Sequence, residues 1–139
     1  NVGGNVRAIG TKPNSGPWVA GVDNPWPDQD GQYATASYVD TVELQPEQSL
    51  VISGDYQRYF TVDGVRYHHL IDLTTLQPAR YMNSVAIVSS DSGLGDALST
   101  GVFCMPVEKG QALIEQLNDV EALWMLSDET MVQSSGWGK

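Results

Sequence analysis

A carboxylate and a hydroxyl stand four residues apart in the segment DSGLGDALST, which covers residues 91–100. The segment reads as a helix start, and on a helix Asp96 and Thr100 share one face. Two hard oxygen ligands suit Mg²⁺, and an Asp with a Thr holds magnesium in other phosphate-handling sites. The pair therefore predicts a metal site. An aspartate near a helix start can instead cap the helix or interact with its dipole, and the spacing alone leaves that alternative open.

Two adjacent histidines, His68 and His69, are the second candidates for chemistry. They lie in an expected strand over residues 65–71, so their side chains should point to opposite faces. An imidazole has a pKa near neutrality, which suits a base that accepts a hydroxyl proton. The alternative is that both rings are surface residues, and for His68 we expect a surface position.

The elements that must position these residues are mostly strands. An Asp-Gly pair at residues 63–64 is the strongest hairpin signal in the sequence. Short alternating or apolar runs predict strands over residues 5–10, 18–22, 35–44, 49–53, 59–62, 65–71, 84–89, 122–126 and 130–133.

Two helices are expected in the C-terminal part, over residues 93–105 and 107–117. Apolar residues that should form the buried face of the second helix are Ala112, Leu113 and Leu117. Together these elements predict an α+β fold with a mostly antiparallel sheet, in a single domain over residues 1–139.

The charge balance limits the classes of partner. Seven basic residues face seventeen acidic ones, and the net charge of −10 argues against nucleic acid or an anionic membrane surface. Phosphate binding stays open, because a metal ion and backbone N–H groups can hold a pyrophosphate in an acidic protein. Cys104 is the one cysteine, so an intrachain disulfide is excluded. Trp137 is expected in a mobile tail.

Four segments, in order along the chain, carry a resemblance to a known family. The chain opens with NVGGN, and SGDYQRYF, HHLID and DALST cover residues 53–60, 68–72 and 96–100. They resemble the C-terminal half of the ApbE family, the FAD:protein FMN transferases. Members of that family show an asparagine-glycine-glycine segment, an SGDYxRYF strand, an HHIIDPxTG-like turn and a D-A-x-x-T helix start. The resemblance covers nearly the whole chain.

The resemblance implies a Mg²⁺-dependent transfer of FMN from FAD to a Thr hydroxyl of an acceptor flavoprotein, with release of AMP. Asp96 and Thr100 would hold the magnesium. His69 would be the catalytic base and a flavin contact, and the backbone around Leu70 and Ile71 would also contact the flavin. Hydrolysis of FAD to FMN and AMP is one alternative, and a catalytically inactive flavin-binding module is another. FAD is expected rather than FMN or a nicotinamide, because the four segments resemble this family and because no GxGxxG segment follows a strand.

Two departures from the family pattern matter. Residues 72–76 read DLTTL, whereas the family has Pro and Gly in this turn, so the turn must be built differently or be looser. We expect Asp72 to cap this turn rather than to orient His69. No segment matches the DLGxxAKG-like segment of the family's earlier half. The N-terminal half of the same protein, or a partner chain, is therefore expected to complete the site. By resemblance alone the protein is expected to be exported and membrane-anchored, on the periplasmic or extracellular side of a bacterial cell.

Overall fold

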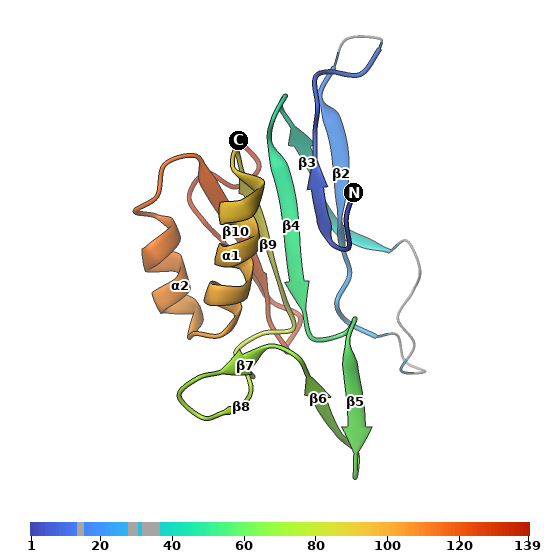
Figure 1. The fold of residues 1–139 in the computed structure, drawn as a ribbon, viewed down its shortest axis with the longest axis vertical. Coiled ribbons are helices and arrows are strands. Elements are labelled where there is room, and N and C mark those ends of the chain that lie inside the picture. The colour runs from blue at the N-terminus through green and yellow to red at the C-terminus, as the bar shows by residue number, and fades with distance from the viewer. Residues whose placement is uncertain (14–15, 28–30, 32–36) are drawn as a thin grey trace.

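A five-stranded antiparallel sheet forms the centre of the computed structural model, which describes residues 1–13, 16–27, 31 and 37–139 (Figure 1). The strand order is β1-β4-β9-β10-β11. The bounds are β1 Asn5–Arg7, β4 Ser49–Gly54, β9 Ser84–Ser89, β10 Val120–Met125 and β11 Met131–Gln133. The predicted α+β class with mostly antiparallel pairing is confirmed.

Both faces of this sheet are covered, which explains the apolar composition of its central strand. Helices α1 (Ser92–Phe103) and α2 (Val107–Ile114) lie on one face, and the hairpin of β2 (Trp18–Asp23) and β3 (Tyr38–Leu44) lies on the other (Figure 1). All six residues of β9 are buried. Its side chains alternate between the two cores, and β10 alternates in the same way. A strand covered on both faces does not alternate between polar and apolar residues, and residues 85–88 of β9 accordingly form a continuous apolar run between Ser84 and Ser89.

Two small hairpins extend from one end of the sheet (Figure 1). In the first, β5 (Tyr59–Val62) pairs with β6 (Val65–His68), and Asp63 and Gly64 at the turn have φ angles of 49° and 78°. Positive φ at both positions is the requirement of a type I′ turn, so the predicted hairpin is confirmed. In the second, β7 (Ile71–Asp72) pairs with β8 (Gln77–Pro78). The strand expected over residues 65–71 is therefore wrong at its end, because the chain leaves the first hairpin after His68.

The first helix begins at a side-chain cap. The Asp91 carboxylate accepts hydrogen bonds from the N–H groups of Gly93 and Leu94, at 2.9 and 3.1 Å. These contacts satisfy two of the four N–H groups that a helix start leaves without a partner. The helix therefore starts one residue earlier than predicted, and it ends at Phe103, two residues before the predicted end.

The second helix buries a face that differs from the predicted one. The helix ends at Ile114, three residues before the predicted end. Gly110 and Ile114 are buried, whereas Ala112 and Leu113 are exposed, and Leu117 packs against the core from beyond the end of the helix. Gly110 lies in close packing, because a Cβ there would stand 3.3 Å from the Cβ of Val102 and 3.4 Å from the indole nitrogen of Trp124. The absence of a side chain lets this helix approach the sheet closely, which a count of apolar residues does not detect.

The C-terminal segment is anchored, so the prediction of a mobile tail at Trp137 is wrong. Its side chain is 8% exposed, and its Nε1–H donates to the Asp40 carboxylate on β3 at 2.8 Å. Residues 35 and 36 of the strand predicted over 35–44 lie outside the described residues. Neither described helix is long and apolar enough to cross a membrane.

Candidate functional site

The outer face of α1 presents the predicted acid–hydroxyl pair. Asp96 and Thr100 are both exposed, while Gly95 and Ser99, one position before each of them, are buried against the sheet. The helical spacing that the sequence predicted is therefore confirmed. Asp91 is the cap of this helix. A capping role is thus excluded for Asp96, one of the two alternatives that the spacing had left open.

The oxygens of Asp96 and Thr100 fit a magnesium ion in kind and in accessibility. Within the described part of the chain, no three His, Cys, Asp or Glu side chains converge into a metal-binding group. Two ligands are fewer than Mg²⁺ needs, but this cation commonly keeps water and takes substrate phosphate oxygens as the remaining ligands. The pair is therefore suited to a metal that arrives with a phosphorylated substrate.

His69 stands at the exposed side of the chain between the two small hairpins. From His69 to Leu73 the residues alternate, with His69, Ile71 and Leu73 exposed and Leu70 and Asp72 buried. The Nδ1 atom of His69 lies 3.4 Å from the backbone oxygen of Arg58. A carbonyl only accepts, so this contact favours the tautomer with the proton on Nδ1. Nε2 is then left with a lone pair, which is the atom a base uses.

Leu70 and Ile71, the predicted flavin contacts, differ in accessibility. Leu70 is 3% exposed, and its backbone oxygen accepts from the N–H of Ala79 at 2.9 Å. Its own N–H donates to a ring nitrogen of His68 at 3.3 Å. Ile71 is 40% exposed and presents its side chain on the same face as His69. A ligand beside His69 would therefore meet the side chain of Ile71 before the backbone of Leu70.

His68 is buried, so the expectation of a surface residue is wrong. Its side chain is 5% exposed, and Nε2 lies 2.9 Å from the backbone oxygen of Ala79. The ring of Phe103, at the end of α1, meets it edge-on with centroids 5.6 Å apart. Burial lowers the pKa of His68, although the carbonyl of Ala79 acts in the opposite direction. The alternation of a strand predicted opposite faces correctly, but it did not show that a helix covers one of them.

The contact between His68 and Phe103 places the C-terminal end of α1 beside the segment that holds His69. Thr100 precedes Phe103 by three residues on α1, and side chains at this spacing are neighbours on a helix surface. Phe103 in turn contacts the residue next to His69. Phe103 thus lies about one turn beyond Thr100 and two turns beyond Asp96 on α1, and its ring contacts His68, the neighbour of His69.

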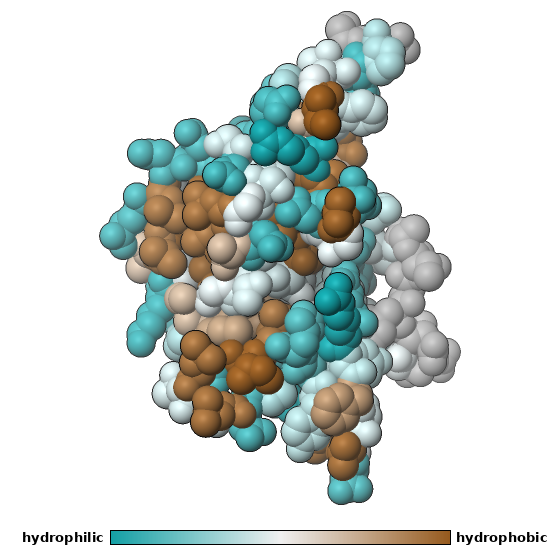
Figure 2. Space-filling view, in the orientation of Figure 1, coloured by the Kyte–Doolittle hydropathy of each residue, from teal (hydrophilic) through white to brown (hydrophobic). Residues whose placement is uncertain are grey.

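The turn that departs from the family pattern is well ordered by hydrogen bonds. The Asp72 carboxylate accepts from the N–H of Thr74 at 2.8 Å and from the hydroxyl of Tyr81 at 3.0 Å. These bonds, that of Thr74 first, lower the pKa of Asp72. Asp72 is therefore a turn cap, as predicted. The N–H of Leu76 donates to the backbone oxygen of Asp72 at 2.8 Å, and Leu76 has a φ of 57° where the family carries Gly. Apolar side chains gather on the surface at this turn (Figure 2), and Leu73 and Leu76 are 84% and 72% exposed.

The SGDY segment has a structural role at the end of β4. Asp55 is buried; its carboxylate lies 3.4 Å from the Arg66 guanidinium and accepts from Asn83 at 3.1 Å. Burial raises the pKa of Asp55, while Arg66 and Asn83 lower it in part. These contacts tie the hairpin β5–β6 to the main sheet, beside a polar hollow of about 530 Å³. A Cβ at Gly54 would overlap the ring of Tyr56, so the glycine makes room for that ring.

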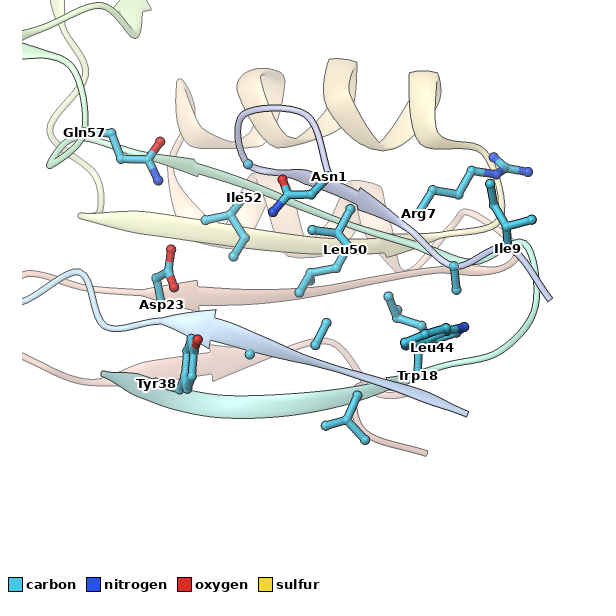
Figure 3. A pocket seen from close by; sticks show the side chains of 16 residues that line it. Asn1, Arg7, Ile9, Trp18, Asp23, Tyr38, Leu44, Leu50, Ile52 and Gln57 are labelled. Carbon is cyan, nitrogen blue, oxygen red and sulfur yellow. The ribbon is translucent and has the colours of Figure 1, made fainter. Parts of the chain in front are cut away.

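A larger hollow of about 570 Å³ lies between β1 and β4 on one side and the hairpin β2–β3 on the other (Figure 3). Apolar side chains such as Leu50, Ile52 and Leu44 form its floor, and Arg7 and Asp23 stand at its rim. His69, Asp96 and Thr100 do not line this hollow or the polar one. The candidate chemistry therefore lies on an open surface.

The fold and the site together define an α+β domain with an acid–hydroxyl pair on α1 and an imidazole in the segment beside the end of that helix, groups that serve phosphoryl transfer. The model of the ApbE family matches residues 1–124. The chain belongs to the ApbE family.

Individual relatives and solved structures support this assignment. The chain is 33% identical over 136 residues to a FAD:protein FMN transferase of Klebsiella pneumoniae, covering 97% of this chain and 39% of that protein. It is 34% identical over 145 residues to one of Treponema pallidum, covering 98% and 38%. The crystal structure of the ApbE protein from Thermotoga maritima is 37% identical with a TM-score of 0.82, covering 96% of this chain and 41% of that chain. The flavin transferase ApbE from Vibrio cholerae is 28% identical with a TM-score of 0.75. The chain spans about two fifths of the length of these relatives, since the shares lie between 38% and 41%.

Proposed function

We propose that the protein to which this chain belongs transfers FMN from FAD to a threonine hydroxyl of an acceptor flavoprotein and releases AMP. The observation that carries the proposal is the contact of Phe103 with His68, at 5.6 Å between ring centroids. It places the end of α1, one turn beyond Thr100, beside the segment that holds His69. Relatives named FAD:protein FMN transferase match nearly the whole chain, which supports the same conclusion.

His69 is the proposed base. With its proton held on Nδ1 by the Arg58 carbonyl, Nε2 accepts the proton of the acceptor hydroxyl. The hydroxyl oxygen then forms a bond to the phosphorus of the FMN moiety. The bond from that phosphorus to the bridging oxygen of the pyrophosphate breaks, and AMP leaves with the bridging oxygen. A His69 that is exposed on the surface suits this role, because the incoming hydroxyl belongs to another protein.

Asp96 and Thr100 are the proposed magnesium ligands. The ion, when bound with FAD, would neutralise charge on the pyrophosphate and on the departing AMP. The two side chains stand clear of the sheet on the outer face of α1, so substrate oxygens can reach the same point. The other ligands would come from the substrate, from water or from the rest of the protein.

The flavin is proposed to lie along the exposed face of His69 and Ile71, where an apolar side chain and an imidazole can meet its ring. The chain spans about 40% of the length of its relatives. We therefore propose that the N-terminal half of the protein, or a partner chain, supplies the remaining contacts to FAD. By resemblance, we also propose that the protein lies outside the cytoplasmic membrane of a bacterial cell.

Single substitutions of the metal ligands in the complete protein test the proposal. Asp96→Asn is nearly isosteric and removes the charge, and Thr100→Val removes the hydroxyl while keeping the shape. Both should lower the rate of FMN transfer by about a hundredfold or more, since each removes charge stabilisation at the pyrophosphate. Asp119→Asn is the matched control, because Asp119 is exposed and has a φ of 58° that Asn tolerates.

Transfer is followed by in-gel flavin fluorescence of the acceptor, and FAD binding by calorimetry at several magnesium concentrations. The proposal requires that Asp96→Asn lose the magnesium dependence while Asp119→Asn keeps it. An unchanged rate and an unchanged magnesium dependence in Asp96→Asn would refute the metal assignment. Release of free FMN and AMP with no labelled acceptor would identify the protein as a FAD pyrophosphatase instead.

A further inference from the structure

We propose that His68 is a positioning residue, whose buried neutral imidazole fixes the backbone on both sides of His69 and so orients the catalytic imidazole. The inference rests on the proposed function for the role of His69. It concerns a residue for which the sequence had predicted only a surface position.

Three hydrogen bonds form a closed set around His68. Its Nε2 lies 2.9 Å from the backbone oxygen of Ala79, and its Nδ1 lies 3.3 Å from the backbone nitrogen of Leu70. The third joins the same two partners directly, because the N–H of Ala79 donates to the backbone oxygen of Leu70 at 2.9 Å. One imidazole thus joins two backbone segments, one on each side of the turn at residues 72–76.

The segment around His69 needs such a fastening because it lies between two separate hairpins. β6 ends at His68 and β7 begins at Ile71, and each belongs to a two-stranded sheet apart from the central one. A two-stranded hairpin is only marginally stable by itself. The side chain of His69 has one hydrogen bond within the described residues, the long 3.4 Å contact to the Arg58 carbonyl. The orientation of its ring is therefore set mainly by the backbone on either side.

The hydrogen-bond partners require the neutral form of His68. The carbonyl of Ala79 can only accept, so Nε2 carries the proton, and the N–H of Leu70 can only donate, so Nδ1 must offer its lone pair. A second proton on Nδ1 would face the N–H of Leu70, and the contact would be lost. Protonation of His68 therefore releases the backbone beside His69.

The surroundings keep His68 neutral at pH 7. Burial is the largest effect and lowers its pKa, and the nearby charges of Arg80 and His69 act in the same direction. Asp55, beyond the end of β4, and the carbonyl of Ala79 raise the pKa. The element packed against the ring from the other side, α1, contributes the uncharged ring of Phe103.

Three substitutions in the complete protein separate positioning from mere filling of space. His68→Ala removes both ring nitrogens, His68→Asn places an oxygen near the position of Nδ1, and His68→Gln places an amide N–H near the position of Nε2. We expect His68→Ala to lower kcat for FMN transfer by about tenfold to a hundredfold, because small displacements of a catalytic group cost about this much. The KM for FAD should change less. His68→Asn or His68→Gln should recover a large part of the lost rate, since each restores one of the two hydrogen bonds.

Two measurements on the same variants do not depend on transfer. Amide hydrogen exchange at Leu70 should be faster in His68→Ala than in the wild type. In His68→Asn it should be slower than in His68→Ala. Nitrogen NMR of the wild type should show His68 neutral at pH 7 with its proton on Nε2, and its pKa should lie below that of an exposed histidine. If the wild type transfers no FMN, the proposed function fails, while these two readouts still judge the role of His68.

Three outcomes would overturn the inference: a wild-type kcat in His68→Ala, unchanged exchange at Leu70, or equal loss in all three variants. If His68→Ala fails to fold, the comparison moves to Asn and Gln. If His68→Asn and His68→Gln both lose kcat while the amide hydrogen of Leu70 exchanges as slowly as in the wild type, positioning through these bonds is refuted.

Discussion

Leu76 occupies a backbone conformation that favours glycine, and this allows a sharp test of how the turn at residues 72–76 is built. Its φ is 57° and its side chain is 72% exposed, while Leu73 in the same turn is 84% exposed and is not among the residues with positive φ. A Cβ in the left-handed region costs roughly 1–2 kcal/mol. An opposite effect acts on the unfolded chain, because glycine gives it more conformational freedom than alanine does. This effect lowers the stability of a glycine variant by about 0.4–1 kcal/mol relative to the alanine variant.

The difference between these two effects predicts the order of two variants. Leu76→Gly should be more stable than Leu76→Ala by about 0.8 kcal/mol, because only the alanine keeps the Cβ. Both variants lose the contacts of the leucine side chain, so those contacts cancel in the comparison. At Leu73 the order should reverse, with Leu73→Ala more stable than Leu73→Gly by about 0.4–1 kcal/mol.

The assay is urea unfolding of all four variants, analysed with a common dependence on denaturant. The reasoning fails if alanine is the more stable variant at both positions, because the backbone at Leu76 would then not be in the left-handed region. A smaller loss in Leu76→Gly than in Leu76→Ala, with the reverse at Leu73, confirms it.

Three further predictions concern the elements that hold the site. Asp91→Ala should lower the free energy of unfolding by about 1 kcal/mol, because two N–H groups of α1 lose their acceptor. Asp91→Asn keeps an acceptor and should change the free energy of unfolding by only a few tenths of a kcal/mol. Equal losses for the two variants in urea unfolding would contradict the capping role. Because the pKa of His68 is lowered in the folded state, the unfolded chain binds the proton first, so stability should fall as the pH drops below about 6.5. This acid loss should be smaller in His68→Gln, and a loss of the same size in both proteins would assign it to other groups. Trp137→Phe should lower the free energy of unfolding by about 1–2 kcal/mol, because the hydrogen bond to Asp40 is lost. Trp18→Phe, at a half-exposed position, should change it little. A thermal unfolding midpoint of Trp137→Phe equal to that of the wild type would show that the C-terminal segment is not anchored there.

Much of the fold could be predicted from local patterns, because those patterns have local causes. The Asp-Gly pair at residues 63–64 predicted a tight hairpin since both positions have positive φ there. The apolar run at residues 84–89 predicted a strand, and β9 has the predicted bounds. The helical spacing of Asp96 and Thr100 was predicted for the same reason, since it depends only on the period of one helix.

The errors arise where a distant residue decides the outcome. His68 is buried because Phe103, 35 positions later, packs against it, and the alternation of a short strand has no information on that contact. Trp137 is anchored by Asp40, 97 residues earlier in the chain. The buried face of α2 includes Gly110, which packs against Val102 and Trp124 without a side chain of its own, so a count of apolar residues does not identify that face.

In the candidate site, too, local patterns predicted some features and distant contacts decided the others. Residue types and spacing predicted the acid–hydroxyl pair and the candidate base separately, and the family resemblance assigned their roles. That the end of α1 lies beside the segment of His69 follows from the contact between Phe103 and His68, which no local pattern predicts. The surroundings of His68, which motivate its role as a positioning residue, follow from the burial of a side chain that strand alternation alone would leave at the surface.

The most direct test of the proposed activity is the intact mass of an acceptor flavoprotein after incubation with the complete protein, FAD and magnesium. The account predicts a gain equal to FMN less one water on a single threonine, with one AMP released for each acceptor labelled. His69→Ala should abolish the gain while FAD still binds, because loss of a base affects the transition state more than the ground state. An acceptor of unchanged mass, with FAD bound or hydrolysed, would contradict the proposed transfer. A full mass gain with His69→Ala would leave the transfer intact and remove His69 as its base.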